Sequence, residues 1–128
     1  MNKSIFLLIT FSLLLLSSCF TVRDGNHFSY QKLAPSAYLN KIQEIQPHYL
    51  IDVRTPNEFK KSHLPQAINF SYFANHFDSD VDTLNRDWPV FLYCQTCHRS
   101  PLAAKILKKK GFKTVYDLKG GYSQLDTK

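Results

Sequence analysis

The residues most able to do chemistry lie in one short segment that contains two cysteines. Cys94 and Cys97 belong to the sequence Cys-Gln-Thr-Cys-His-Arg-Ser, directly after the apolar run 89–93. A loop between a buried strand and a helix start points backbone N–H groups at an anion. The helix dipole and Arg99 should also favour the thiolate of Cys94, the nucleophilic form. We therefore predict that Cys94 attacks a charged sulfur or phosphorus compound. The predicted binding residues are Gln95, Thr96, Cys97, His98, Arg99 and Ser100.

Two charged residues at the end of a neighbouring apolar run are candidate supports for this loop. Asp52 and Arg54 end the run 49–53, which we expect to be a buried strand. Carboxyl ends of parallel strands share one edge of a sheet, so these side chains should lie near the cysteine loop. The residue types fit two roles equally well: orienting the loop, or forming a structural ion pair.

The same cysteine segment is compatible with other chemistries. Cys-x-x-Cys-His is the c-type haem attachment signature, but the only methionine is Met1, so a histidine would have to be the sixth ligand. A Cys-x-x-Cys pair at a helix start also fits a thiol–disulfide redox protein. The remaining histidines show no paired zinc-ligand spacing. We expect no metal and no cofactor.

The elements that must position these residues alternate along the chain. Apolar runs predict strands at 28–33, 49–53, 67–70, 89–93 and 114–118. A helix is predicted to open at Pro35 and to be closed by Pro47, with Leu39, Ile42 and Ile45 on one face. Further helices are predicted from the capping box at Thr55, over 78–85, and from Ser100 to Lys110, stopped by Gly111. A last short helix follows Gly120-Gly121. Alternating strands and helices predict an α/β domain with a mainly parallel sheet flanked by helices.

Spaced segments across residues 30–125 resemble the rhodanese family of sulfurtransferases. The first signature is seen in Leu50-Ile51-Asp52-Val53-Arg54, Glu58-Phe59, His63-Leu64-Pro65 and Ala67-Ile68-Asn69. Cys94 to Ser100 resembles the active loop, and Gly111-Phe112, Val115-Tyr116, Leu118 and Gly120-Gly121-Tyr122 resemble the closing segment. The resemblance implies a single rhodanese-like domain over residues 28–128, with a persulfide on Cys94. It also implies that sulfur arrives from a small anionic donor such as thiosulfate and leaves to a cyanide, thiol or protein acceptor.

The length of the cysteine loop distinguishes sulfur chemistry from phosphoryl chemistry among proteins that resemble this family. Phosphatases of similar fold carry a loop one residue longer, so the six residues from Cys94 to Arg99 favour sulfur over phosphoryl chemistry. Some rhodanese-like domains are binding modules that commonly lack the cysteine, which this chain keeps. A non-enzymatic persulfide carrier or binding module therefore stays an alternative, beside the thiol–disulfide redox protein.

The chain departs from the family pattern at a few positions. Cys97 stands at a loop position usually held by glycine, Ser62 and Gln66 replace two further glycines, and Leu125 replaces a tryptophan. Cys97 bears on mechanism, because a second thiol could close a disulfide with Cys94 or attack its persulfide. Cys97 is thus either a resolving thiol or a small residue tolerated where glycine was.

The first residues predict export and a lipid anchor. Lys3 precedes an uncharged apolar run over residues 5–16, which has the length of a secretory signal and is too short to span a bilayer comfortably. Leu16-Ser17-Ser18-Cys19 resembles a bacterial lipobox. We predict a signal peptide over 1–18, lipidation of Cys19, and a lipidated start and tether over 19–27. The mature protein would be attached to the membrane on the periplasmic or extracytoplasmic face of the cell envelope.

Length and charge limit the remaining possibilities. A chain of 128 residues with 44% hydrophobic residues supports one globular domain. The net charge of +6 could favour anionic small molecules, acidic partners or a membrane surface. No basic stripe is interleaved with aromatic residues, so we expect no nucleic-acid partner.

Overall fold

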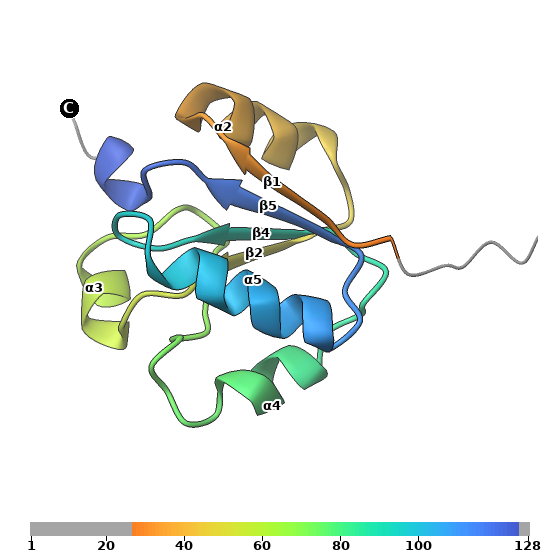
Figure 1. Ribbon diagram of the computed structural model, residues 1–128. Coiled ribbons are helices and arrows are strands. Elements are labelled where there is room, and N and C mark those ends of the chain that lie inside the picture. The colour runs from red at the N-terminus through yellow and green to blue at the C-terminus, as the bar shows by residue number, and fades with distance from the viewer. Residues whose placement is uncertain (1–26, 126–128) are drawn as a thin grey trace, which may run out of the picture.

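The fold is built on one parallel sheet. The computed structural model describes residues 27–125, and Figure 1 shows the arrangement of the elements. Five strands lie in the order β1-β5-β4-β2-β3, and every pair is parallel. The strands are β1 (Ser29–Leu33), β2 (Tyr49–Asp52), β3 (Ile68–Asn69), β4 (Val90–Tyr93) and β5 (Thr114–Leu118). The predicted α/β fold with a parallel sheet is confirmed.

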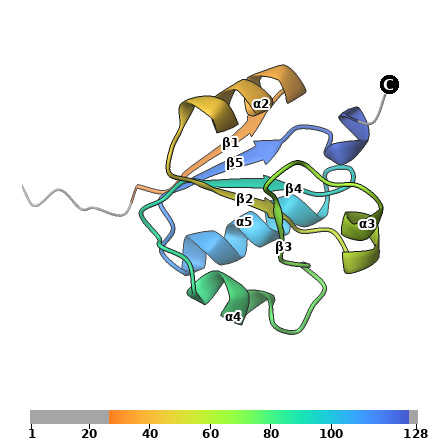
Figure 2. The ribbon, with the colours of Figure 1, turned by 180° about the vertical axis from the view of Figure 1, so that it is seen from behind.

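Helices cover both faces of this sheet. On one face lies α2 (Pro35–Glu44), and on the other lie α4 (Phe77–Asp82) and α5 (Arg99–Lys109), as both views show (Figures 1 and 2). The short helix α3 (Pro56–Lys61) and the 3-10 turn η1 (Tyr122–Gln124) lie beyond the carboxyl ends of the strands. The loops that hold the candidate catalytic residues therefore lie at that end of the sheet.

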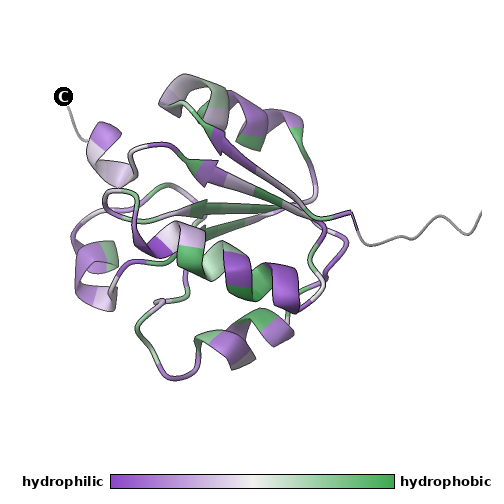
Figure 3. Cartoon of the chain, in the orientation of Figure 1, coloured by the Kyte–Doolittle hydropathy of each residue, from purple (hydrophilic) through white to green (hydrophobic). Residues whose placement is uncertain are grey.

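The core consists of two apolar layers, one on each side of the sheet. Strand β4 is buried along its whole length, as expected of a central parallel strand, and Figure 3 shows the central strands as hydrophobic. Successive side chains alternate between the layers. Phe91 and Tyr93 pack in the layer that contains Tyr38 of α2, and Leu92 and Cys94 pack in the layer that contains Leu107 of α5. This alternation places the Cys94 side chain on the α5 side.

Some element boundaries and one core residue differ from the sequence prediction. The predicted strand over 67–70 shortens to Ile68–Asn69, and the predicted helix over 78–85 is Phe77–Asp82. Leu39 was expected on the buried face of α2, but it is 38% exposed and Tyr38 is fully buried instead. Tyr38 takes the inward position because its hydroxyl donates to the Leu92 carbonyl at 2.9 Å. The side chain of Leu39, the next residue, then points outward.

The predicted signal peptide, Cys19 and the tether up to residue 26 lie outside the described residues. Within residues 27–125, no helix combines the length and apolar character needed to cross a membrane. In the same range, no group of three His, Cys, Asp or Glu side chains is arranged to hold a metal ion.

Candidate active site

Cys94 is held at the carboxyl end of β4, where the chain turns toward α5. Its side chain is 1% exposed, and its Sγ atom lies 3.4 Å from the hydroxyl oxygen of Ser100. Ser100 is itself buried in the first turn of α5. The sulfur is therefore enclosed, and its polar contact within the described part of the chain is one hydroxyl group. A hydroxyl can donate to a thiolate or accept from a thiol.

The loop after Cys94 is held in place by Gly121 and the first residues of η1. Tyr122 N donates to the Cys94 carbonyl at 2.8 Å, and Ser123 N donates to the Gln95 carbonyl at 3.0 Å. Gly121 has a φ of +74°, and a Cβ there would lie 2.3 Å from the carbonyl oxygen of Thr96. Only glycine permits this approach of two backbones. The Gly120-Gly121-Tyr122 segment thus fixes the shape of the cysteine loop.

Asp52 and Arg54 perform both of the roles that the sequence left open. They form a buried ion pair of 2.7 Å, and Arg54 is 2% exposed. Arg54 also donates to the side-chain oxygen of Gln95 at 2.9 Å and to the Ser62 carbonyl at 2.6 Å. Burial alone would lower the pKa of Arg54, but the hydrogen bonds and charge of Asp52 raise it overall. The pair is structural, and it also orients the loop.

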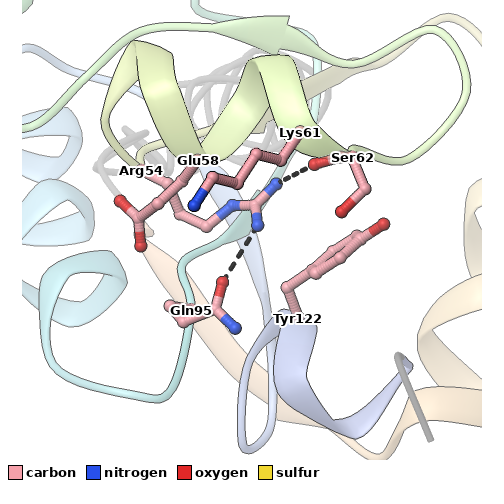
Figure 4. Close-up of a pocket in the computed structure, with 6 residues that line it drawn as sticks. All are labelled: Arg54, Glu58, Lys61, Ser62, Gln95 and Tyr122. Carbon is pink, nitrogen blue, oxygen red and sulfur yellow. Dashed lines mark hydrogen bonds between the residues drawn. The ribbon is translucent and has the colours of Figure 1, made fainter.

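A small cavity adjoins the loop and has a cationic side. Figure 4 shows its lining residues, and its volume is about 240 Å³. The Arg54 guanidinium lies 4.1 Å from the centroid of the Tyr122 ring, and the exposed Lys61 brings a second positive charge. Cys94 is not among the lining residues, so the cavity meets the loop at Gln95. Glu58 also lines the cavity, and its carboxylate is paired with Arg99. The size of the cavity suits a small anion.

Arg99 has a partner that was not identified from the sequence. Its guanidinium makes a two-pronged ion pair with Glu58, at 2.7 and 2.8 Å. The hydrogen bonds to Glu58 are the largest influence that raises the pKa of Arg99, and the charge of Cys94 also raises it, so the predicted favouring of the Cys94 thiolate by Arg99 stays a prediction. The hydrogen bonds from Arg99, with further ones from Thr55, lower the pKa of Glu58 to about 2, against a smaller opposing effect of burial. Glu58 is positioned by the predicted capping box of α3, which is present. Because α3 packs beside the start of α5, Glu58 is within reach of Arg99, and their ion pair joins the two helices.

The three middle loop residues lie on the outer surface. Thr96, Cys97 and His98 are exposed, and the His98 ring nitrogen Nδ1 lies 3.3 Å from Thr96 Oγ1 and 4.0 Å from Cys97 Sγ. Cys94 and Cys97 are both free thiols, one buried and one exposed. A disulfide between them would therefore require the loop to rearrange.

The glycine replacement at Gln66 keeps a glycine-like backbone. Gln66 has a φ of +66°, in the left-handed region that side chains other than glycine rarely adopt. Gln66 therefore holds a backbone conformation that a glycine would adopt without steric cost.

Two residues near the cysteine were not identified from the sequence. Asp117 is 1% exposed in β5, and the Tyr30 hydroxyl donates to its Oδ2 atom at 2.5 Å. The available signal was an acidic residue inside an otherwise apolar strand, Thr-Val-Tyr-Asp-Leu. Such a residue needs a reason to be buried.

Comparison with known proteins identifies this arrangement of strands and cysteine loop. The sequence profile of the rhodanese-like domain matches residues 34–128. The chain belongs to the rhodanese-like domain family. The resemblance to this family stated from the sequence is thereby confirmed.

Several known proteins are similar to this rhodanese-like domain. The uncharacterised protein YqhL of Bacillus subtilis is 41% identical over 75 residues, which cover 59% of this chain and 58% of YqhL. A tRNA sulfurtransferase of Desulfurococcus amylolyticus is 44% identical over 75 residues, covering 59% of this chain and 14% of that protein. Among solved structures, the human single-domain sulfurtransferase TSTD1 superposes with a TM-score of 0.64 at 16% identity, covering 76% of this chain and 96% of that chain. The last comparison establishes the shared fold.

Proposed function

We propose that the chain is a sulfurtransferase that moves sulfane sulfur from thiosulfate, or a similar anionic donor, to a thiol or cyanide acceptor. The observation that carries this proposal is the enclosed Cys94 sulfur beside the Ser100 hydroxyl, at the sheet edge where Arg54 and Lys61 line a small cavity. Membership of the rhodanese-like family, with relatives named as sulfurtransferases, supports the reaction class. The chain covers only parts of the two curated relatives named above, so the whole-protein substrates of those relatives are not carried over.

The reaction proceeds in two half-reactions with a covalent intermediate. The Cys94 thiolate attacks the outer sulfur of thiosulfate, the sulfur–sulfur bond of thiosulfate breaks, and sulfite leaves with the bonding electron pair. Cys94 then carries a persulfide. An acceptor thiolate or cyanide attacks the outer sulfur, and the Cys94 thiolate leaves with the electron pair of the broken bond. Each half-reaction exchanges one nucleophile for another, and no external oxidant or reductant is needed.

The surrounding residues act on position and charge. The Ser100 hydroxyl stabilises the negative charge that Cys94 carries before the first step and after the second. Arg54, which is paired with Asp52, holds Gln95, and the exposed Lys61 supplies the positive charge at the adjoining cavity that attracts a sulfur-containing anion. Glu58 and Arg99 fix the start of α5, from which Ser100 reaches the sulfur.

The test is the intact mass of the protein after incubation with thiosulfate and removal of excess reagent. We expect one added sulfur atom on the wild type and on Cys97→Ser, which serves as the matched cysteine control. Cys94→Ser should remain unmodified and should lack turnover, while its circular dichroism spectrum stays that of the wild type. Equal sulfur loading or full turnover of Cys94→Ser would refute the proposal.

We also propose that Cys19 carries a lipid and that the protein is attached to the cell envelope. The signal-like pattern before Cys19 supports this assignment. Strand β1 begins at the amino end of the parallel sheet, whereas the cysteine loop lies at the carboxyl end. A chain anchored before β1 would hold the cysteine loop on the side away from the membrane, open to donors and acceptors.

Fractionation of cells tests the anchor. Cys19→Ala should leave the membrane fraction or accumulate with its signal peptide uncleaved, while Cys97→Ala should fractionate like the wild type. A wild-type protein found entirely in the soluble fraction, with an unmodified amino terminus, would refute the anchor without bearing on sulfur transfer.

A further inference from the structure

A second cavity lies between α5 and the start of β1, and its lining is strongly basic. Its volume is about 510 Å³, and its lining residues are Phe28, directly before β1, and three lysines of α5, Lys105, Lys108 and Lys109. The three lysines are exposed, and the Nζ atom of Lys108 lies 5.6 Å from the centroid of the Phe28 ring. We call these four residues the basic patch. It has no part in the sulfur chemistry described above.

The positive charges of the basic patch are not balanced by neighbouring carboxylates. Within residues 27–125, none of its three lysines forms an ion pair. The basic residues next to the patch are paired: Arg86 and Lys110 with Asp82, and Lys113 with Asp87. Three unpaired like charges on one helix face repel one another, so an anionic partner would relieve a strain that the fold carries.

The helix dipole does not account for the whole patch. Cations in the last turn of a helix are favourable, and Lys108 and Lys109 lie in the last turn of α5. Lys105 lies outside that turn, three and four residues before the other two, and therefore on the same face of the helix. The three charges thus share one surface beside an aromatic ring, which the dipole does not require.

The basic patch lies toward the end of the molecule at which the proposed lipid anchor is attached. Strand β1 begins directly after Phe28, and α5 runs back from the cysteine loop toward this end, as Figure 1 shows. Nine steps of chain separate Cys19 from Phe28, and they span about 30 Å at most when fully extended. A lipid on Cys19 would therefore keep the patch near the bilayer surface.

An exposed tryptophan lies at the same end of the sheet. Trp88 precedes β4, is 37% exposed and stacks on Tyr49 at the start of β2, with ring centroids 5.2 Å apart. Its loop is joined to the end of α5, because the Nε atom of Arg86 donates to the Lys110 carbonyl at 2.7 Å. Tryptophan and lysine on one surface are typical of proteins that lie on a membrane–water interface.

We propose that the basic patch binds the anionic headgroups of a lipid bilayer and holds the anchored domain with this end on the membrane. Each lysine at an anionic surface should favour the docked orientation about fivefold, so the three together should favour it about a hundredfold. The attraction acts only at short range, because salt screens charges beyond about 10 Å, and the anchor supplies that proximity. The choice of a bilayer as partner rests on the proposed anchor and is independent of sulfur transfer.

Lysine labelling on vesicles tests this orientation with the protein as cells process it. Protein purified in detergent is diluted onto preformed vesicles of phosphatidylcholine, with or without phosphatidylglycerol, and treated with a water-soluble acylating reagent. Peptide mass spectrometry should show Lys105, Lys108 and Lys109 reacting at least about fivefold more slowly on the anionic vesicles. This difference should disappear in about 0.5 M salt. Lys60 and Lys119, exposed at the carboxyl end of the sheet, should react equally on both.

The fluorescence of Trp88, the single tryptophan, reports docking without lysine chemistry. Brominated lipids quench a tryptophan at the bilayer surface, so the wild type should be quenched more on anionic than on neutral vesicles. Replacing the three patch lysines with glutamine should lower the ratio of docked to undocked protein about a hundredfold and abolish this additional quenching. The matched control removes the same charge away from the patch, by Lys32→Gln, Lys60→Gln and Lys119→Gln, and should be quenched like the wild type.

Equal labelling and equal quenching on neutral and anionic vesicles would overturn the proposal. Protection of the patch by a single-stranded oligonucleotide but not by anionic vesicles would also overturn it, as would loss of the additional quenching in the control variant. The state of Cys19 is read from the intact mass of the same sample. Patch protection in a sample with unmodified Cys19 would refute the anchor and support the patch, and none of these measurements needs sulfur transfer. The three proposals therefore fail separately.

Discussion

The guanidinium of Arg54 donates to the side-chain oxygen of Gln95 at 2.9 Å, which joins the residue after β2 to the loop that follows Cys94. The other nitrogen atoms of Arg54 are engaged by Asp52 and by the Ser62 carbonyl. One buried side chain thus connects β2, the end of α3 and the cysteine loop.

This relationship predicts different outcomes for two substitutions. Gln95→Ala removes only the loop end of the link, so turnover should fall about tenfold with a small change in stability, about 1 kcal/mol or less. Arg54→Lys loses the planar fork that serves three partners, so it should lower both turnover and stability, the latter by about 2–3 kcal/mol. Steady-state kinetics and urea denaturation separate the two effects. Undiminished turnover of Gln95→Ala would contradict the positioning role of Arg54.

The fold was predictable because its signals are local and periodic. The strand ending at Tyr93, the capping box at Thr55 and the glycine that stops α5 each depend on a few adjacent residues. The place of Cys94 followed from the same patterns, because parallel strands bring their carboxyl ends to one edge. The boundaries of α4 and β3 were less exact, because short elements carry few periodic positions.

The partners of charged residues were not predictable, because they depend on packing between distant segments. Arg99 was expected to face an anion, but whether it does so depends on how α3 packs against α5, and Glu58 is 41 residues away. Asp117 and Tyr30 are 87 residues apart, and β1 meets β5 only after the sheet has formed. No pattern of adjacent residues predicts contacts such as Arg99–Glu58 or Asp117–Tyr30.

The Arg99–Glu58 pair gives a stability that depends on pH. The pKa of Glu58 in the folded protein is about 2, below its ordinary value of 4.5. Stability from this carboxylate is therefore fully present above pH 4.5 and is lost as the pH falls toward 2. Glu58→Gln retains the capping box and removes the charge, so we expect a loss of about 1 kcal/mol at pH 7, a modest value because Glu58 is partly exposed.

Urea denaturation at pH 7, 4.5 and 3 measures this dependence. The difference between the wild type and Glu58→Gln should shrink between the last two values. Asp87→Asn is the matched control, since Asp87 pairs with Lys113 in an exposed site and should contribute less than about 0.5 kcal/mol. A difference for Glu58→Gln that stays constant over the whole range would rule out the ion pair as its source.

The close approach of Gly121 to the cysteine loop predicts a specific loss of activity. A Cβ in Gly121→Ala would lie 2.3 Å from the Thr96 carbonyl oxygen, so the loop must move. Gly111→Ala is the matched control, because Gly111 also has a positive φ, of +86°, but its Cβ would meet only the Arg86 side chain at 3.8 Å. Both variants should lose about 1 kcal/mol or more of stability. Only Gly121→Ala should slow persulfide formation more than about tenfold, as measured by mass spectrometry after thiosulfate addition. Equal rates in the two variants would contradict the fastening role of Gly121.

The position of Cys97 leads to a prediction about redox control. We propose that Cys97 is a resolving thiol, which attacks the Cys94 persulfide, releases hydrogen sulfide and leaves a Cys94–Cys97 disulfide for an external thiol to reduce. In the resting structure Cys94 is buried and Cys97 exposed, so this attack requires the loop to detach from Gly121 and Tyr122. Wild-type protein should therefore lose turnover slowly in the absence of a reductant and regain it when a thiol is added. Cys97→Gly should keep its activity in both conditions.

Because the attack by Cys97 requires the cysteine loop to detach from Gly121 and Tyr122, a variant with a looser loop tests the redox role of Cys97 further. Gly121→Ala loosens the loop, so the persulfide that it does form should be converted to the Cys94–Cys97 disulfide faster than in the wild type, even though the persulfide itself forms more slowly. Gly111→Ala, which is remote from the loop, should form the disulfide at the wild-type rate. Non-reducing peptide mapping after thiosulfate treatment measures the disulfide directly in each variant. If the wild type and Cys97→Gly have equal activity without a reductant, and no disulfide accumulates in Gly121→Ala, then Cys97 only occupies a glycine position and has no redox role.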